Sequence, residues 1–205
     1  MQLGFDLGSE PLPKVVPAFA SAQAFKTALT DWLGPQKGAS KLFAHWVETP
    51  VGTMVAICDA THLHLLEFAD RKELPKELRK LSAQAGTISI GQTKITRLLE
   101  DQLSAYFAGD LTQFDIPLVL HGTDFTQGVW RALQELPYGT TTSYGDLSVT
   151  LGNPTATRAV ARANGANQIA ILIPCHRVIG ADGSLTGYAG GLWRKRALLA
   201  LEQGA

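Results

Sequence analysis

The chain has 205 residues, of which 45% are hydrophobic and 18% charged, which is typical of a globular protein with one large or two small domains. Its formal net charge is zero, with +2 over residues 123–205 and −2 over the rest, which excludes a strongly basic field for nucleic acid. Two cysteines, with no Cys-x-x-Cys spacing, argue against a disulfide scaffold and favour a reducing compartment. No apolar run approaches membrane length, and no basic-then-apolar leader opens the chain, so we expect a cytoplasmic protein without a membrane segment.

The first 120 residues predict an extension followed by a small mixed domain. Residues 1–40 are rich in glycine and proline, which predicts a loop-rich extension with one short helix at 21–33. In residues 41–120, segments rich in β-branched and aromatic residues alternate with turn residues and predict an antiparallel meander, which helices follow. The expected extended segments are 42–48, 53–59, 62–68, 87–90 and 114–120, and the expected helices are 71–84 and 93–107.

Residues 121–205 predict a second domain that is mostly helical. Ser143 can cap one of its helices and Gly152 can end it, and Pro154 stands where the next helix can begin. Two short helices joined by a tight glycine-containing turn are typical of a helix-turn-helix, although two packed helices of a bundle have the same pattern. The expected helices are 126–136, 144–151, 155–164 and 192–203.

The residues that can carry chemistry follow the apolar run Ile169–Ile173. That run is long enough for a buried strand and too short for a helix, and Pro174 ends it because proline donates no ladder hydrogen bond. Cys175, His176 and Arg177 come next, so a thiol lies on a rigid element beside two groups that can lower its pKa. A single buried cysteine is most often an inert core residue, and one Cys-His pair is too few ligands for structural zinc, so the surrounding sequence has to decide.

The sequence around Cys175 resembles the active-site block of the O6-alkylguanine-DNA alkyltransferases, in which an apolar run precedes Pro-Cys-His-Arg-Val. The resemblance is close over residues 125–202 and looser over the preceding hundred residues. It implies an α+β fold: a small N-terminal α/β domain of the ribonuclease-H-like type, then a helical C-terminal domain with a winged helix-turn-helix-like DNA-binding motif. The residues at family-like spacing are Tyr144, Arg158, Asn167, Cys175, Tyr188 and Glu202.

This resemblance implies DNA repair by direct, irreversible transfer of an alkyl group from O6 of a flipped-out guanine to Cys175, with activity on O4-alkylthymine left open. His176 would take the thiol proton through a water molecule, and Glu202 would orient and stabilise the imidazole. Tyr144 would donate its hydroxyl to the base as negative charge develops, and Asn167 would hydrogen-bond across the turn before Cys175. A thioether does not hydrolyse readily, so the protein would act once, as a single-turnover methylated-DNA–protein-cysteine methyltransferase.

The resemblance also implies that the helix-turn-helix binds DNA. In the family the second helix enters the minor groove, and the residue that matches Arg158 fills the gap left by the flipped nucleotide. Alanines keep this helix slim here, and Arg158 and Arg162 lie four apart, so they can share a face. The expected DNA-binding residues are Thr155, Ala156, Arg158 and Arg162, and the expected partner is double-stranded DNA bound by a monomer.

A loop near the C-terminus is expected to shape the alkyl pocket. Positions matching Tyr188, Ala189 and Gly190 line the pocket in the family, and small residues at the last two predict room for groups larger than methyl. Arg177 is expected to tie the two domains together. The sequence has no phosphate-binding loop, dinucleotide pattern or metal-ligand set, so we expect neither a cofactor nor a metal, and Cys58 is assigned no role.

Three other functions remain open. A Cys-His hydrolase would turn over steadily on an ester, and a lesion-binding module would hold alkylated DNA without transfer, against which the intact Cys175 argues. A transcriptional regulator would need a further DNA-binding domain, and residues 19–35 are similar only to the last helix of the arabinose-regulator type.

Overall fold

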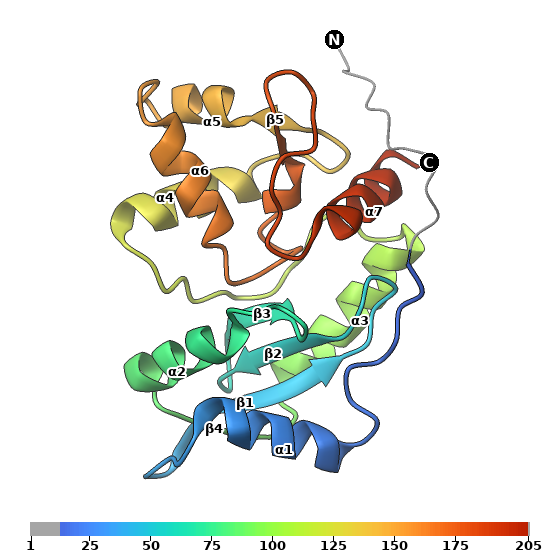
Figure 1. Ribbon diagram of the computed structural model, residues 1–205, viewed down its shortest axis with the longest axis vertical. Helices are drawn as coiled ribbons and strands as arrows, with labels where there is room; N and C mark the ends of the chain where they lie inside the picture. The colour runs from blue at the N-terminus through green and yellow to red at the C-terminus, as the bar shows by residue number, and fades with distance from the viewer. Residues whose placement is uncertain (1–12, 205) are drawn as a thin grey trace. The chain divides into compact units, whose positions relative to one another are not determined.

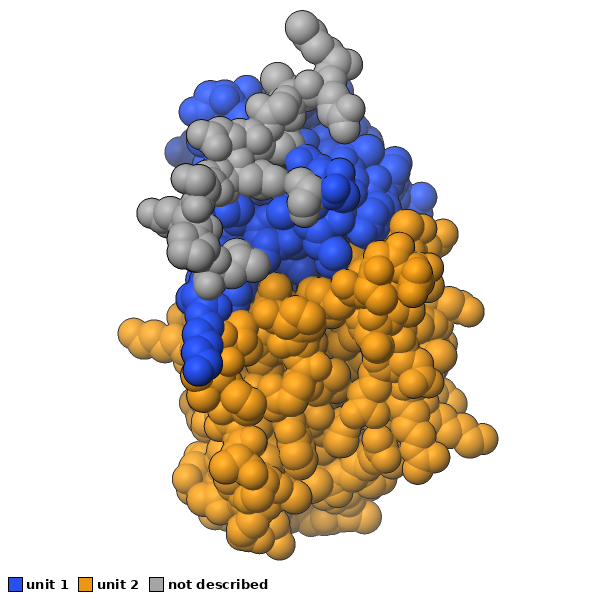
Figure 2. Space-filling model, turned by 90° about the vertical axis from the view of Figure 1, so that its right-hand side faces the viewer, with its two compact units in different colours: residues 1–14, 122–205 blue, residues 15–121 orange. Residues whose placement is uncertain are grey.

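A computed structural model describes residues 13–204, and the loop character expected of residues 1–12 lies outside them. The chain divides into two compact units, one of residues 15–121 and one of residues 122–204 together with Pro13 and Lys14 (Figure 2). Within the described range, no helix combines the length and the apolar character needed to cross a membrane. The division separates a sheet-containing unit from a mainly helical one, and the predicted α+β class is confirmed.

The first unit is built on a four-stranded sheet in the order β3-β2-β1-β4 (Figure 1). Strands β1 (Ser40–Val47), β2 (Met54–Cys58) and β3 (Leu63–Phe68) pair antiparallel, which confirms the predicted meander. Strand β4 (Thr87–Ile90) returns parallel to β1 after a helical crossover, as parallel pairing requires. Every residue of β2 and β3 is buried, and both strands contribute side chains to the core of the unit.

Three helices pack on this sheet. Helix α1 (Ala22–Leu33) is capped by Ser21, α2 (Leu74–Ala85) carries a proline in its first turn, and α3 (Lys94–Ala108) begins with a capping box at Thr93. Helix α1 confirms the short helix expected at 21–33 within the extension, and it packs on α2 and supplies buried side chains to the core of this unit. The core residues on this side are Phe19, Phe25, Leu29, Leu42, Ala44, Val55, Ile57, Leu65, Leu74, Leu78, Leu81 and Ile88.

The second unit is mainly helical, with α4 (Asp124–Gln134), α5 (Tyr144–Thr150), α6 (Thr157–Gly165) and α7 (Leu192–Gln203). Helix α6 packs against both α4 and α5, so α5 and α6 form the predicted helix-turn-helix (Figure 1). Helix α6 begins later than the expected residue 155, because residues 154 and 155 lie in a turn and Ala156 is the N-cap.

The apolar run Ile169–Ile173 is buried, but Ile169 makes only an isolated bridge and the residues after it form a turn instead of the expected strand. Backbone amides bond within the run: the amide of Ile173 donates to the carbonyl of Ile169 at 3.0 Å, and Ile171 has a positive φ of 72°. The two-stranded sheet of this unit is formed instead by the short strands β5 (Thr142–Ser143) and β6 (Val178–Ile179), which run parallel. An apolar run predicts burial, and only the pairing partner decides whether a buried segment is a strand.

Candidate active site

Cys175 opens a single 3-10 turn, η1 (Cys175–Arg177), and is only 6% exposed. The buried Asn167 holds the chain on its approach to this thiol. Its Nδ2 donates to the carbonyl of Ile173 at 2.8 Å and lies 3.1 Å from Sγ of Cys175, and its Oδ1 accepts from the amide of Ile169 at 3.0 Å. One side-chain amide therefore holds both the buried turn and the sulfur.

His176 is fully buried, and its Nε2 lies 2.9 Å from Oε1 of Glu202. Because a carboxylate accepts, Nε2 carries the hydrogen and Nδ1 carries the lone pair. Burial lowers the pKa of His176, and this outweighs the opposing effect of Glu202. Among the described residues, Nδ1 is buried and has no hydrogen-bond partner. The imidazole is therefore neutral near pH 7, with one basic nitrogen free to accept a proton.

The Glu202 carboxylate also binds Arg177, whose Nε donates to Oε2 at 2.8 Å and whose Nη2 donates to Oε1 at 2.9 Å. Burial by itself would raise the pKa of Glu202, but the hydrogen bonds from His176 and Arg177 outweigh it and lower this pKa to about 2. Arg177 also donates to the carbonyl of Leu136 at 2.6 Å. We expected Arg177 to tie the two domains, whereas these bonds lie within residues 122–204 and build the site itself.

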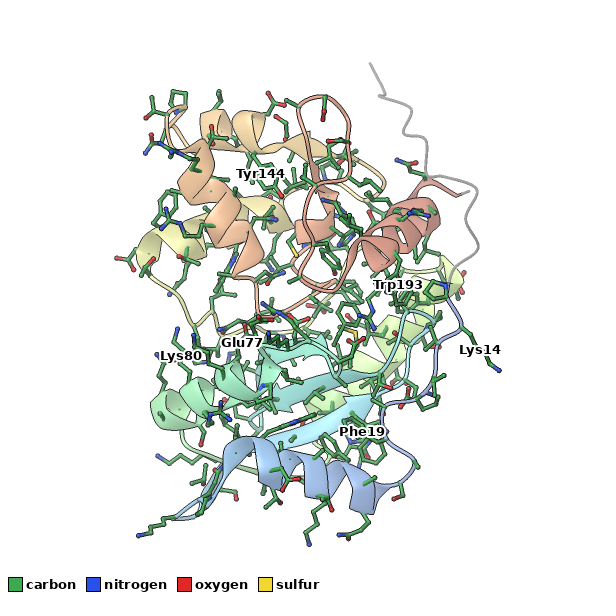
Figure 3. The ribbon with its side chains drawn as sticks, viewed as in Figure 1. Lys14, Phe19, Glu77, Lys80, Tyr144 and Trp193 are labelled. Carbon is green, nitrogen blue, oxygen red and sulfur yellow. The ribbon has the colours of Figure 1, made fainter. Side chains whose placement is uncertain are left out.

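Tyr144 reaches this neighbourhood through the pairing of β5 with β6. Ser143 pairs with Ile179, so the next residue, Tyr144, starts α5 beside the strand that leaves η1. Ser143 also caps the helix, because its Oγ accepts from the amide of Asp146 at 3.0 Å. Tyr144 is half-buried within the second unit, where Figure 3 labels it.

The residues expected at DNA lie on α6 and in the turn that precedes it. Arg158 and Arg162 are exposed one turn apart, and neither side chain makes a hydrogen bond or ion pair with another described residue. Thr155 is exposed in the preceding turn, where its hydroxyl donates to Oδ1 of Asn153 at 3.1 Å, and Ala156 caps the helix. Two unengaged guanidinium groups on one helix face are able to contact phosphates or bases.

The expected pocket loop closes in a turn immediately before α7. The amide of Gly191 donates to the carbonyl of Tyr188 at 2.9 Å, and Gly191 has a φ of 91°, which favours glycine. Within the turn Ala189 is exposed and Gly190 is buried, and the carbonyl of Gly190 accepts from Nη1 of Arg194 at 2.8 Å. The loop is thus fixed to the helix that carries Glu202.

Two residues that contact this site were not predicted from the sequence. Gly139 donates its amide to Oε2 of Glu202 at 3.3 Å, and a Cβ at this position would lie 2.7 Å from the Glu202 carbonyl oxygen. Lys195, on α7, is completely buried. The helical spacing of Lys195 could have indicated its burial, because it precedes the buried Leu198 and Leu199 by three and four residues and so lies on the same face of the helix.

Comparison with protein families matches both units. Residues 42–120 match the family model described as 6-O-methylguanine DNA methyltransferase, ribonuclease-like domain. Residues 124–204 match the model described as 6-O-methylguanine DNA methyltransferase, DNA binding domain. Neither match covers α1.

Individual relatives agree with these matches. A methylated-DNA–protein-cysteine methyltransferase of Mycobacterium tuberculosis is 64% identical over 103 residues, which is 50% of this chain and spans 62% of the relative. One from Methanosarcina acetivorans is 44% identical over 155 residues, 76% of this chain and 94% of the relative. The crystal structure of a Mycobacterium tuberculosis protein of this type in complex with DNA superposes with a TM-score of 0.66, at 45% identity, over 80% of this chain and 92% of that one. Since both units match and the relatives are matched over most of their length, the chain belongs to the 6-O-methylguanine DNA methyltransferase family.

Proposed function

We propose that this protein repairs DNA by moving the alkyl group from O6 of a guanine to its own Cys175, once per protein molecule. The observation that carries this proposal is the buried hydrogen bond between Glu202 and His176. It leaves Nδ1 of His176 without a partner among the described residues, on the residue that directly follows Cys175. A water molecule at Nδ1 would satisfy the nitrogen and relay the proton from Sγ. The family relationship supports the same chemistry, because the relatives are named for transfer to a protein cysteine.

The transfer balances without a further reactant. The Cys175 thiolate attacks the alkyl carbon, so that an S–C bond forms as the C–O6 bond breaks and the electron pair stays on guanine. The thiol proton, taken up first by His176, is the proton that the departing guanine finally regains. Tyr144 donates its hydroxyl to the base while negative charge develops there. Glu202 stays ionised throughout and stabilises the imidazolium that forms in between.

DNA is the proposed partner, and α6 is the proposed contact. Its two exposed arginines match the requirement for binding a polyanion and for filling the stack once a base is extruded. The Mycobacterium tuberculosis relative crystallised with DNA supports this assignment. We propose that Thr155 and Ala156 border the same groove, since they immediately precede the first turn of α6, which carries Arg158.

Incubation with excess duplex DNA that carries one O6-methylguanine is expected to remove close to one equivalent of lesion per protein and then stop. Intact mass measurement should show one added methyl group, and peptide mapping should place it on Cys175. The variant Cys175→Ser keeps the size of the side chain and is expected to bind the DNA without any transfer. Continued turnover beyond one equivalent would contradict the proposal and favour the Cys-His hydrolase instead.

We propose that the pocket accepts groups larger than methyl, because Ala189 and Gly190 present little side chain there. Free O6-benzylguanine is expected to inactivate the wild-type protein, and Gly190→Trp is expected to slow this roughly tenfold to hundredfold, since overpacking costs about 1–3 kcal/mol. Methyl transfer should be largely spared. Gly187→Trp is the matched control, because a Cβ at the exposed Gly187 meets open space. Wild-type protein that repairs methylated DNA but ignores the benzylated base would refute an open pocket.

We also propose that the protein acts in the cytoplasm as a monomer. Cys175 has to remain a thiol until it reacts, and neither Cys58 nor Cys175 forms a disulfide with another described residue. Cell fractionation with an antibody against the chain tests the location.

A further inference from the structure

Lys195 is one of the largest fully buried side chains of the protein, although lysine is almost never fully buried without partners. Its Nζ donates to the carbonyl of Val178 at 2.6 Å and to the carbonyl of Thr186 at 2.7 Å. Within the described residues it forms no ion pair with a carboxylate. A buried ammonium held only by carbonyl dipoles keeps its positive charge available to its surroundings.

The two carbonyls belong to two separate segments, the strand that follows the nucleophile and the segment before the pocket loop. Val178 is the residue directly after η1, which carries the nucleophile, and Thr186 lies just before the pocket loop. On the same helix, Arg194 holds the far end of that loop through the carbonyl of Gly190. Helix α7 therefore fixes the loop at both ends, and Lys195 is the side chain that also binds the strand leaving the nucleophile.

The charge of Lys195 acts on Cys175. Burial lowers the pKa of Lys195 to about 8, and the charge of an ionised Cys175 is the influence that raises it. The other charged or titratable groups here are His176 and Arg177 on η1 and Glu202 on α7. Glu202 is already shared between His176 and Arg177, and the Lys195 charge adds to burial in lowering the pKa of His176.

We propose that Lys195 is a positioning residue for alkyl transfer: its ammonium joins the strand after Cys175 to the pocket loop, and its charge favours the Cys175 thiolate. The role proposed for Lys195 in alkyl transfer rests on the proposed function, because that function identifies the alkyl donor. The effect on the thiolate is a property of the protein alone and can be measured without DNA.

Reaction of Cys175 with iodoacetamide, followed by peptide mass measurement across pH 5–10, tests the effect on the thiolate. In Lys195→Met the pH midpoint is expected to rise by about one unit, which lowers reactivity about tenfold at pH values below both midpoints. Lys195→Arg keeps the charge and should restore most of the shift. Arg194→Met is the matched control, because it loosens the same loop without removing the charge beside Cys175, and its midpoint should stay at the wild-type value. A folded Lys195→Met protein with the wild-type midpoint would overturn the proposal.

A second measurement does not depend on the folding of any Lys195 variant. Coupling between two charges is reciprocal, so a lysine that favours the thiolate must itself be held protonated by it. NMR titration of Nζ is therefore expected to show a lower midpoint for Lys195 in Cys175→Ser than in the wild-type protein. An identical titration in the two proteins would refute the effect on the thiolate.

The positioning effect has its own readout. Inactivation by free O6-benzylguanine, measured at a pH where the thiols of both proteins are fully ionised, is expected to remain slower in Lys195→Met than in the wild type, because the loop is no longer fixed to β6. Equal rates under those conditions would refute the positioning effect. Neither the iodoacetamide assay nor the NMR titration uses a guanine, so failure of the proposed function would appear separately, in the one-equivalent experiment.

Discussion

Glu202→Gln is expected to slow alkyl transfer to Cys175 by roughly a hundredfold or more, the usual contribution of a general base. The carboxylate accepts the hydrogen on Nε2 of His176 at 2.9 Å, which leaves the lone pair on Nδ1. Glutamine is neutral and can present its own N–H to the ring, so the orientation and the tautomer of the imidazole are no longer fixed. Single-turnover rates on a duplex with one O6-methylguanine measure the loss.

The same substitution leaves the buried Arg177 without its ion-pair partner, which typically destabilises a protein by about 3–5 kcal/mol. Rates therefore have to be measured at a temperature where circular dichroism shows the variant to be folded. Glu135→Gln, at an exposed carboxylate of the same unit, is the matched control and should leave both rate and stability unchanged. A folded Glu202→Gln protein with the wild-type rate would remove Glu202 from the mechanism.

At acid pH, the difference in stability between the wild-type protein and Glu202→Gln is expected to become smaller. The pKa of Glu202 is lowered from 4.5 to about 2, so its ionised form stabilises the folded state above pH 4.5 by about 3 kcal/mol. This contribution is lost as the pH falls from about 4.5 towards 2, because the carboxyl then becomes protonated in the unfolded chain first. Urea unfolding at pH 7 and pH 3.5 should therefore show a smaller difference between wild type and Glu202→Gln at the lower pH.

Arg158→Ala is expected to slow repair of duplex DNA about a hundredfold and to leave the reaction with free O6-benzylguanine near the wild-type rate. Extruding a base costs a few kcal/mol of stacking and pairing, and a side chain that fills the gap offsets part of that cost. The free base needs no extrusion, so the loss should be confined to DNA. Arg158 is exposed on α6 and bonded to no described residue, so the substitution removes no internal contact.

Arg131→Ala provides the matched control, because it removes an exposed arginine from α4 of the same unit and should leave the duplex rate nearly unchanged. The ratio of the duplex rate to the free-base rate is the quantity to compare among the three proteins. If Arg158→Ala slowed both reactions equally, Arg158 would serve the pocket or the fold instead of base extrusion.

Several elements were predictable from local sequence because their causes are local. The meander follows from short β-rich segments that alternate with turn residues, and α7 matches its predicted span of 192–203 because its helical spacing is continuous. The segment of Cys175, His176 and Arg177 was recognisable because these residues are adjacent in the chain. Its resemblance to known alkyltransferases supplied the expected partners, including Glu202.

Other features depended on contacts between distant segments. The run Ile169–Ile173 predicted burial correctly and a strand wrongly, since its apolar residues satisfy a buried turn equally well. The pairing of β5 with β6 involves two residues in each strand, too few for any periodicity to indicate.

The sequence by itself determined which residues carry the chemistry and which helices can form, because both depend on residue types and on their spacing over a few positions. Only the tertiary structure decided that Arg177 binds Glu202, that Gly139 is confined by the Glu202 carbonyl, and that Lys195 is buried between two carbonyls. The physical reason is that sequence alone predicts solvent exposure for a charged side chain, because burial of its charge depends on partners that the sequence does not identify. Those partners lie 9 to 63 residues away and meet only when the helices of the second unit pack.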